Sequence, residues 1–427
     1  MPGEILVVRA AHVLPVGTPP VRDGAVAIED HRIVAVGPAA MVQATVSERV
    51  SAGRVGGSPT LRDLGSVALL PGLVNSHTHL ELSWLSGRVP PASTLPAWVR
   101  TLLAARRAAG GDDAAAVGPA LRSAREAGTV AVGDIGNGTS AYASLTEAVF
   151  DAVAFYEIIG FAPENPDRLV DAAVAEIEAL PSSPTVRPAL AAHAPYSVHP
   201  DTLRRLGRER QERGRRPMSV HLGESGEEGE FLASGTGAWR ALLGELGTWN
   251  PSWKAPATTP AAYLEALGFL GPGVLAVHGV HLGDGDLERL ARLDVTLVTC
   301  PRSNLWTGVG APPIDRFYAS GVKVAVGTDS LASNTDLSVF AELETLRRLS
   351  RDVPASRLIE SATLRGAEAL GLGAELGSIA PGRRAALVAV DVPPSTVDVE
   401  EYLVGGIPPD RIRWVTSPES WRLDRPC

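Results

Sequence analysis

The spacing of apolar residues changes along the chain and separates its two ends from a long central part. Near the N-terminus, short β-type runs at 4–9, 24–29 and 32–36 are divided by turns rich in Gly, Pro and Asp. A short β-type run of the same kind occurs at 385–391, after the turn Pro381-Gly382. Because neither end shows helical spacing, we predict a small β domain that both termini build together.

Between residues 66 and 371 the pattern alternates between short apolar runs and longer helical stretches. The short runs are nearly continuous in Val, Ala and Leu, as in parallel strands that are buried on both faces. They lie at 73–79, 129–135, 153–159, 187–193, 218–222, 274–280, 295–300 and 322–328. Helical stretches at 114–127, 167–180, 201–213, 284–293 and 337–350 fall between them. This alternation predicts an α/β protein with a (β/α)8 TIM barrel.

The predicted domains are a composite β-sandwich of residues 1–65 and 372–427, and a barrel of residues 66–371. A doubly wound open sheet is the alternative, but no strand is followed by G-x-G-x-x-G opening a helix. One irregular insertion at about 225–260 carries three Trp with several Gly and Pro. We expect it to form a lid over the active face, and a satellite core or a homodimer interface is the open alternative.

Composition narrows the classes of partner. Hydrophobic residues make up 45% of the chain, mean hydropathy is +0.08 and the net charge is −9, so no basic surface for nucleic acid or anionic lipid is expected. The N-terminal residues lack the pattern of a signal peptide, and no run of about 18 apolar residues occurs, so we expect neither a leader nor a membrane-spanning helix. Two cysteines, Cys300 and Cys427, are too few for a disulfide framework. We therefore predict a cytoplasmic protein that acts on a small molecule, without nucleic-acid or membrane partners.

Polar residues collect where the predicted strands end. In a barrel of this kind the carboxyl ends of the strands form the active face. The residues at these ends are His77, His79, His193, His221, His278 and Asp329. Residues i and i+2 of a strand point to the same face, so His77 and His79 can reach one metal ion together. Imidazoles with one carboxylate suit one divalent ion, Zn²⁺ in the first place and Fe²⁺ as the alternative, at a catalytic site.

Glu224 supplies a candidate base, because it lies three residues beyond His221. A carboxylate there can take a proton from water at the metal and hand it to a leaving group. The alternative is a helix N-terminal acid, since residues 225–230 are acidic. Neither Lys254 nor Lys323 lies where a lysine could bridge two metals. Glu157 could bridge in principle, but we assign it to supporting a ligand, so one ion is expected.

Six segments together resemble the amidohydrolase superfamily, in its cytosine/adenosine deaminase-like branch. They are residues 71–79, 193–196, 221–224, 277–281, 300–304 and 327–330. The resemblance implies that the metal ligands are His77, His79, His221 and Asp329. It also implies that Glu224 shuttles protons, that His278 and Asp329 orient the attacking water, and that His193 contacts the substrate ring.

A finer resemblance concerns the run His79-Leu-Glu81-Leu-Ser83 and the Trp-containing insertion. Both are similar to enzymes that deaminate 6-amino-6-deoxyfutalosine in the alternative menaquinone pathway, which implies hydrolytic release of ammonia and makes Glu81 a candidate substrate contact. That substrate carries a benzoate, for which Arg88, Arg100 and Arg302 are candidate partners. Deamination of another purine nucleoside and cyclic amide hydrolysis, as in imidazolonepropionases, stay open. A protein that only binds metal, without turnover, is disfavoured by the presence of both Glu224 and Asp329, because storage of a metal would not need a base beside an open coordination site.

Overall fold

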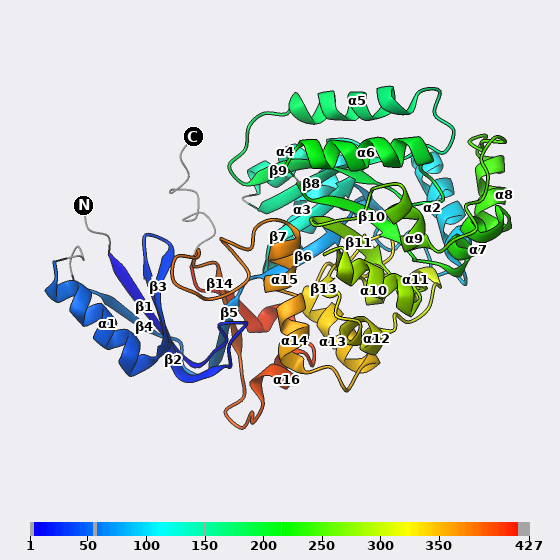
Figure 1. The fold of residues 1–427 in the computed structure, drawn as a ribbon. Helices are drawn as coiled ribbons and strands as arrows, with labels where there is room; N and C mark the ends of the chain where they lie inside the picture. Colours follow the sequence, from blue (N-terminus) through cyan, green and yellow to red (C-terminus); the bar gives the residue numbers. More distant parts are fainter. Residues whose placement is uncertain (1–3, 54–57, 149, 215, 417–427) are drawn as a thin grey trace.

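The barrel predicted from the sequence is present in the computed structural model, which describes residues 4–53, 58–148, 150–214 and 216–416. Within these ranges, eight parallel strands pair in chain order from β6 to β13 (Figure 1). They are β6 (Leu73–Thr78), β7 (Thr129–Gly136), β8 (Asp151–Ile158), β9 (Val186–Ala192), β10 (Met218–Leu222), β11 (Val274–His278), β12 (Thr296–Thr299) and β13 (Lys323–Val326). Each expected strand is confirmed, with ends that differ from the expected ones by at most two residues.

Helices connect these strands and surround the barrel. They are α2 (Leu95–Ala109), α3 (Val117–Glu126), α4 (Tyr142–Glu147), α5 (Pro166–Glu178), α6 (Pro200–Glu212), α7 (Gly226–Ser234), α8 (Gly237–Glu245), α9 (Pro260–Ala266), α10 (Asp284–Arg292), α11 (Pro301–Thr307), α12 (Ile314–Ala319), α13 (Val339–Leu349), α14 (Ala355–Ser361) and α15 (Leu364–Ala369), with 3₁₀ turns η1 (Leu80–Leu85) and η2 (Ala114–Ala116). Helix α5 illustrates how the sequence determines where a helix begins and which of its faces is buried. The Asn165 side chain accepts a hydrogen bond from Arg168 N at its start, and Val170, Ala173 and Ile177 form its buried face.

The two chain ends build a second sheet beside the barrel, on the left in Figure 1. Its strands are β1 (Ile5–Val13), β2 (Val21–Glu29), β3 (Arg32–Pro38), β4 (Thr60–Asp63), β5 (Val67–Pro71), β14 (Leu387–Asp391) and β15 (Ile412–Trp414). The expected β domain from both termini is therefore confirmed. It is one continuous sheet that folds over, so that Val8 and Val26 share a core with Leu69 and Leu387. Residues 417–427, part of the predicted domain and the site of Cys427, lie outside the described residues.

The terminal sheet also contains elements that the sequence did not predict. Helix α1 (Ala39–Ser51) buries Val42 and Val46 against the sheet, while α16 (Val399–Leu403) and η3 (Pro409–Arg411) follow β14. The boundary at residue 66 is also displaced. Strand β5 pairs antiparallel with β14, so residues 67–71 belong to the terminal sheet instead of the barrel.

One residue joins the two sheets. Gly72 separates β5 from β6, and its N–H donates to Ala386 O at 2.8 Å. A Cβ at this position would lie 2.8 Å from Cβ of Val130 and 3.1 Å from the Trp414 ring, so only glycine fits here. The apolar run that the sequence presents as one interrupted strand is thus two strands in two sheets.

The barrel closes beside its first and last strands. The N–H groups of Thr328 and Asp329 both donate to His77 O at 3.1 Å. A side chain on Gly327 would place its Cβ 2.8 Å from the Cβ of His77, so a glycine before Thr328 permits this close approach. The end of β13 is thereby held against the end of β6, which brings Asp329 to His77.

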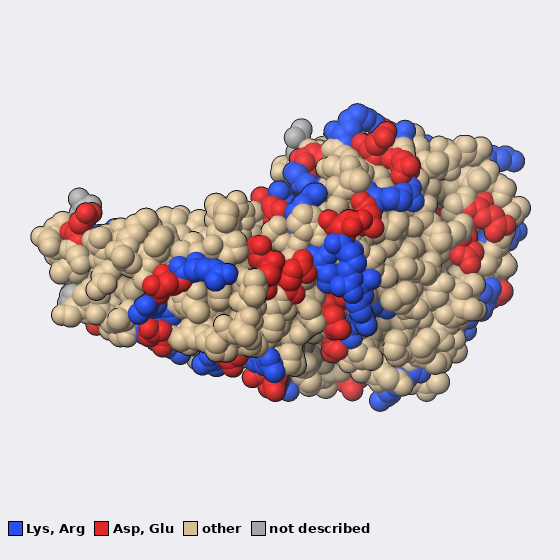
Figure 2. Space-filling model, turned by 90° about the horizontal axis from the view of Figure 1, so that it is seen from below, with Lys and Arg blue, Asp and Glu red and all other residues tan. Residues whose placement is uncertain are grey.

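The outer surface carries both signs of charge. On the face drawn in Figure 2, acidic and basic side chains lie next to one another instead of forming one large patch of a single sign. None of the helices in the described ranges has both the length and the apolar character needed to cross a membrane.

Candidate metal centre and active-site cavity

His77 and His79 lie at the end of β6 and face the same carboxylate. Nε2 of His77 is 3.8 Å from Asp329 Oδ1, and Nε2 of His79 is 3.5 Å from the same oxygen. The His77 ring is fully buried, yet neither of its nitrogens has a hydrogen-bond partner. Buried polar atoms are normally paired, so an imidazole in this state is suited to a ligand that the protein itself does not supply.

His221, at the end of β10, is oriented by the backbone carbonyl of His193, which follows β9. Its Nδ1 lies 2.8 Å from His193 O and 3.5 Å from Glu157 Oε1. A proton on Nδ1 satisfies the carbonyl and leaves Nε2 as a lone-pair donor, which is the usual arrangement of a metal-ligating histidine. The rings of His77 and His221 are 5.0 Å apart, so both can contribute to one centre.

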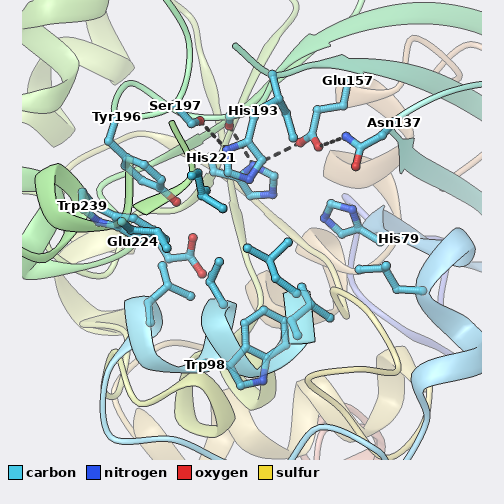
Figure 3. A pocket seen from close by; sticks show the side chains of 18 of the residues that line it. His79, Trp98, Asn137, Glu157, His193, Tyr196, Ser197, His221, Glu224 and Trp239 are labelled. Atoms are coloured by element: carbon cyan, nitrogen blue, oxygen red, sulfur yellow. Dashed lines mark hydrogen bonds and ion pairs between the residues drawn. The ribbon is translucent and has the colours of Figure 1, made fainter. Parts of the chain in front are cut away.

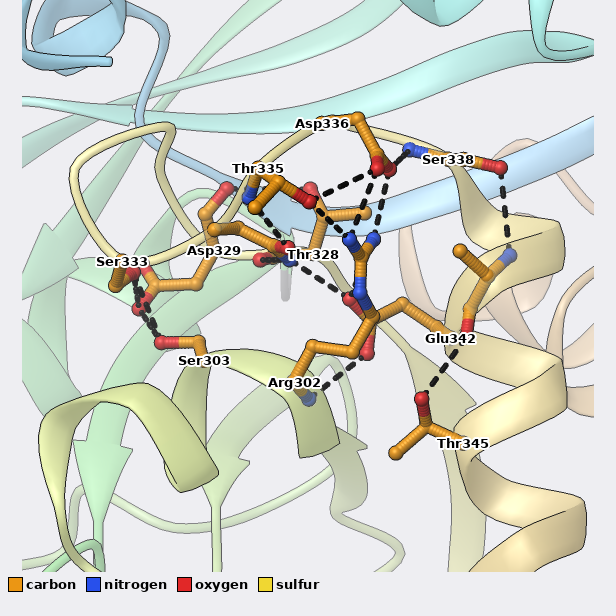
Figure 4. Close-up of polar contacts among 12 residues, drawn as sticks. Arg302, Ser303, Thr328, Asp329, Ser333, Thr335, Asp336, Ser338, Glu342 and Thr345 are labelled. Atoms are coloured by element: carbon orange, nitrogen blue, oxygen red, sulfur yellow. Dashed lines mark hydrogen bonds and ion pairs between the residues drawn. The ribbon is translucent and has the colours of Figure 1, made fainter. Parts of the chain in front are cut away.

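Asp329 follows β13 and is fixed by two hydroxyl groups. Ser303 and Ser333 donate to its Oδ2 at 2.5 and 3.0 Å (Figure 4). Its other oxygen, Oδ1, is the one that faces His77 and His79. Its backbone has a positive φ of 59°, and that of His278 is 79°. Such conformations are costly outside glycine and persist where the surrounding structure holds them, often at functional sites.

The donor set fits a divalent metal ion. In the part of the chain that the structure describes, the ligand atoms of His77, His79 and Asp329 lie within 4.8 Å of one another, as do those of His77, His221 and His278. Burial lowers the pKa of His77 well below its usual value, so the ring is neutral and able to bind a cation. Neutral imidazoles with one carboxylate match Zn²⁺ and similar borderline ions.

Glu224 and His278 stand next to each other beside this centre. His278 Nε2 is 3.5 Å from Glu224 Oε1, and Asn304 Nδ2 donates to His278 Nδ1 at 3.0 Å. Because Nδ1 accepts, the proton of the neutral ring is on Nε2 and points into the site. Burial, reinforced by the negative charges of Asp329 and Glu228, raises the pKa of Glu224 well above its usual value. A raised pKa lets this carboxyl group hold a proton more readily than an exposed glutamate does, which suits a group that accepts and then releases a proton.

A cavity of about 270 Å³ opens over these residues (Figure 3). Its polar end is formed by His79, Glu81, Asn137, Glu157, His193, His221, Glu224, His278 and Asp329. The other end is apolar and is lined from α2 and α8, with Leu95, Trp98, Val99, Leu102, Leu103, Leu242, Leu243 and, after β8, Ile159 and Phe161. A ligand that fits both ends has a polar reactive group and an apolar extension.

Comparison with known proteins assigns the chain to a family. The amidohydrolase family profile matches residues 68–413. The chain belongs to the amidohydrolase family. It is 32% identical to a 5-methylthioadenosine/S-adenosylhomocysteine deaminase of Syntrophobacter fumaroxidans, over 86% of this chain and 80% of the relative. A protein of the same description from Moorella thermoacetica is 31% identical, over 94% and 90%. This amidohydrolase is therefore a hydrolase of carbon–nitrogen bonds, as the sequence predicted.

Solved structures share the fold of this amidohydrolase. An adenosine deaminase of Xanthomonas campestris with bound zinc superimposes with a TM-score of 0.77 at 26% identity, covering 95% of this chain and 90% of that one. The aminofutalosine deaminase of Helicobacter pylori, in complex with methylthio-coformycin, gives 0.80 at 24% identity, with coverages of 93% and 95%. A profile of the imidazolonepropionase-like composite domain of bacteria matches residues 24–45, which belong to the terminal sheet and α1.

The structure brings most of the predicted site residues of the amidohydrolase together, but it does not place Arg302 there. Glu81 and His193 line the cavity. The Arg302 guanidinium instead donates to both carboxylate oxygens of Asp336, at 2.7 and 2.9 Å (Figure 4). Arg302 was expected to contact substrate because it follows a strand end, yet α11 begins at Pro301 and carries its side chain away from the cavity.

The other two arginines considered for an anionic substrate are also engaged elsewhere. Arg100 pairs with Glu245 at 2.8 Å, and the Arg88 guanidinium lies over the Trp84 ring. Arg106 on α2, which the sequence analysis missed, does line the cavity and pairs with Asp112 at 2.5 Å. Asn137 was missed as well, and it donates to Glu157 Oε2 at 2.8 Å. Helical spacing places Arg100 and Arg106 on one helix, but only the folded chain shows which of the two faces inward.

The insertion at 225–260 is more regular than its composition indicated, since it forms α7 and α8. Trp239 lines the cavity, stacks on Tyr196 with ring centres 3.9 Å apart, and its Nε1 lies 3.4 Å from Ser225 Oγ. Trp249 and Trp253 instead pack with Phe161 and Phe231 in an aromatic cluster. The segment therefore contributes one tryptophan to the cavity wall and two to an aromatic cluster that is continuous with the main hydrophobic core.

Two tryptophan variants should separate these roles. Trp239→Ala removes an aromatic wall of the cavity, so we expect KM to rise about tenfold, the scale of one lost aromatic contact. Trp253→Ala should lower the melting temperature and leave KM near the wild-type value. Steady-state kinetics and thermal unfolding of both variants check this, and an unchanged KM in Trp239→Ala would contradict the assignment of Trp239 to the substrate cavity.

Proposed function

We propose that this amidohydrolase is a metal-dependent deaminase that hydrolytically removes the amino group from an aminated purine nucleoside. The observation that carries the proposal is the pair formed by Glu224 and His278 at the polar end of the cavity. One is a carboxyl group whose pKa is raised by burial, and the other is an N–H donor held in place by Asn304. Deamination requires both a proton carrier and a donor to the developing oxyanion.

The residues that would hold the metal are His77, His79, His221 and Asp329, which supply three neutral imidazoles and one carboxylate. When bound, a divalent ion provides Lewis acidity, which makes water at the site more acidic and more nucleophilic near neutral pH. Ser303, Ser333 and the His193 carbonyl keep the protein ligands oriented through the hydrogen bonds described above.

Glu224 carries the protons in the proposed reaction. It accepts a proton from the attacking water, whose oxygen forms a bond to the ring carbon that bears the amino group. It then delivers that proton to the adjacent ring nitrogen. The second proton of the water passes to the amino nitrogen, the carbon–nitrogen bond breaks and ammonia leaves. His278 Nε2–H donates to the water-derived oxygen as charge develops on it.

His193 and Glu81 are the proposed contacts to the rest of the nucleoside. His193 Nδ1 lies 2.5 Å from Ser197 Oγ, which fixes the ring so that its other nitrogen faces the cavity (Figure 3). Glu81 Oε2 accepts from Asn137 N at 3.0 Å, and its second oxygen remains to accept from substrate. A carboxylate is the usual partner of ribose hydroxyl groups.

The apolar end of the cavity supports a substituent at the 5′ position, and two candidates differ in its charge. Relatives of the chain are named 5-methylthioadenosine/S-adenosylhomocysteine deaminases, and a neutral methylthio group matches the leucine-rich wall. 6-Amino-6-deoxyfutalosine, an intermediate of menaquinone biosynthesis, is the finer proposal from the sequence. Its benzoate would be recognised by Arg106, in place of the arginines first considered.

Ammonia release from a panel of substrates tests the proposed function. We expect turnover of 6-amino-6-deoxyfutalosine or 5-methylthioadenosine with a kcat/KM at least about tenfold above that of adenosine, because adenosine leaves the apolar end of the cavity empty. A higher kcat/KM for adenosine or guanine would contradict the extended substrate and retain deamination. Ring opening without ammonia release would instead identify a cyclic amide hydrolase.

The variant Arg106→Met distinguishes the two extended candidates. If the carboxylate pairs with Arg106, the ratio of kcat/KM for 6-amino-6-deoxyfutalosine to that for 5-methylthioadenosine should fall at least about tenfold. An unchanged ratio would assign the apolar end to a neutral substituent. Arg107→Met, the next residue on α2, is the matched control because Arg107 is not among the residues that line the cavity.

A further inference from the structure

Glu228 is a fully buried carboxylate that does not line the cavity. It lies in the first turn of α7, four residues beyond Glu224, and is 0% exposed. An acid in a first helical turn is ordinarily placed there by the helix dipole and remains at the surface. Complete burial of a carboxylate is expensive and calls for specific partners.

The partners of Glu228 are the backbone N–H groups of the segment that carries Glu224. Oε1 accepts from Gly223 N at 3.0 Å, and Oε2 accepts from Glu224 N at 3.2 Å. Burial raises the pKa of Glu228 to about 8, and the same two N–H groups oppose that rise. Both oxygens of one side chain are therefore committed to two consecutive peptide groups.

The opposite side of this segment is held as well. Gly223 O accepts from His281 N at 2.8 Å, and Ser225 Oγ lies 3.4 Å from Trp239 Nε1. Only residues 223–225 separate the end of β10 from the start of α7. With the N–H groups tied to Glu228 and the carbonyl tied to the residues after β11, the Glu224 backbone has a fixed place relative to His221 and His278.

We infer that Glu228 is a positioning residue, which holds the Glu224 backbone so that the Glu224 carboxyl group stands beside His278. This inference rests on the proposed function, in which Glu224 carries the protons. Without Glu228, two buried N–H groups would lose their acceptor, and the segment would shift to find water or other partners. Displacements of about 1 Å in a catalytic group can cost as much as 10²-fold in rate.

Two variants of Glu228 should lower turnover to different extents. Glu228→Gln keeps one acceptor oxygen, so one N–H retains its partner, and we expect kcat to fall about tenfold. Glu228→Ala removes both acceptors, and kcat should fall about 10²-fold. In both, KM and metal content should stay near wild-type values, because Glu228 touches neither the cavity nor the proposed metal ligands. Glu227→Gln, a change at the preceding residue of the same turn, is the matched control and should retain wild-type kcat.

Amide hydrogen exchange supplies a readout that does not depend on activity. At least one of the Gly223 and Glu224 amides should exchange faster in Glu228→Gln than in wild type and Glu227→Gln, and both should do so in Glu228→Ala, while amides in β10 keep their protection. The kinetic measurements use 5-methylthioadenosine and 6-amino-6-deoxyfutalosine as the probes, with ammonia release as the signal.

The outcomes are separable. Unchanged kcat and unchanged exchange in a folded Glu228→Gln protein would overturn the inference, as would a loss of rate that is entirely an increase in KM or a loss of metal. If the wild-type protein releases no ammonia from either probe, the proposed function fails. Faster exchange at Gly223 or Glu224 in the Glu228 variants would then still show that Glu228 fixes the backbone of residues 223–225. If Glu228→Ala does not fold, Glu228→Gln alone decides.

Discussion

Glu224→Gln should lower turnover at least about 10²-fold while the protein keeps its metal. The amide has nearly the shape of the carboxyl group but cannot take a proton from water and return it, and general acid–base groups contribute on this scale. Glu224 lies 3.5 Å from His278 and is not among the proposed ligands, so its replacement leaves the coordination set intact. Ammonia-release kinetics together with elemental analysis of the same preparation measure both quantities.

The control for this variant is Glu230→Gln, an exposed acid farther along α7. It changes the net charge of the protein by the same amount and should keep wild-type turnover and metal content. Near-normal turnover in Glu224→Gln would refute the role of proton carrier, and loss of metal from it would make Glu224 a ligand instead.

The second large effect is expected from the metal centre itself. His77→Ala or His221→Ala should reduce bound metal well below one equivalent per chain and abolish turnover in parallel, because each removes one of only four proposed protein ligands. The loss should extend to thermal stability, since the metal binds the folded state alone and its binding energy is then lost.

Metal content by elemental analysis checks this expectation beside His12→Gln, which changes a histidine on β1 in the terminal sheet. That variant should bind metal as the wild type does. A fully metallated and active His221→Ala protein would remove His221 from the ligand set.

The barrel and its histidine cluster could be predicted from the sequence because their signals are local. A buried parallel strand corresponds to a short apolar run in the sequence, and in a barrel the residues at the carboxyl end of each strand lie at the active face. His77, His221 and Asp329 could therefore be assigned to one region. The terminal sheet could be predicted for the same reason, because its strands are also short apolar runs. Its helix α1 was not predicted because Ala39–Ser51 contains several β-branched residues and has a weak amphipathic pattern.

The supporting residues could not be predicted because their partners are distant in the chain or face a direction that spacing does not define. Asn304 meets His278 across 26 positions, and Ser303 meets Asp329 across the same separation. Arg302 was misplaced since its partner Asp336 follows a loop whose course no local pattern specifies. Glu228 was visible only as an acid near a helix start, and its burial depends on how α7 packs.

The joint at Gly72 has a consequence for engineering. Because a single residue, enclosed by Val130 and Trp414, separates β5 from β6, the strand that carries His77, the two sheets have no linker in which a rotation could be absorbed. Strand β5 is in turn held by β14 from the other end of the chain. A shortened protein that starts at Leu73 would leave β14 paired with β15 alone and would remove the segment that precedes the first barrel strand. The barrel and the terminal sheet are therefore best expressed, swapped or redesigned as one unit.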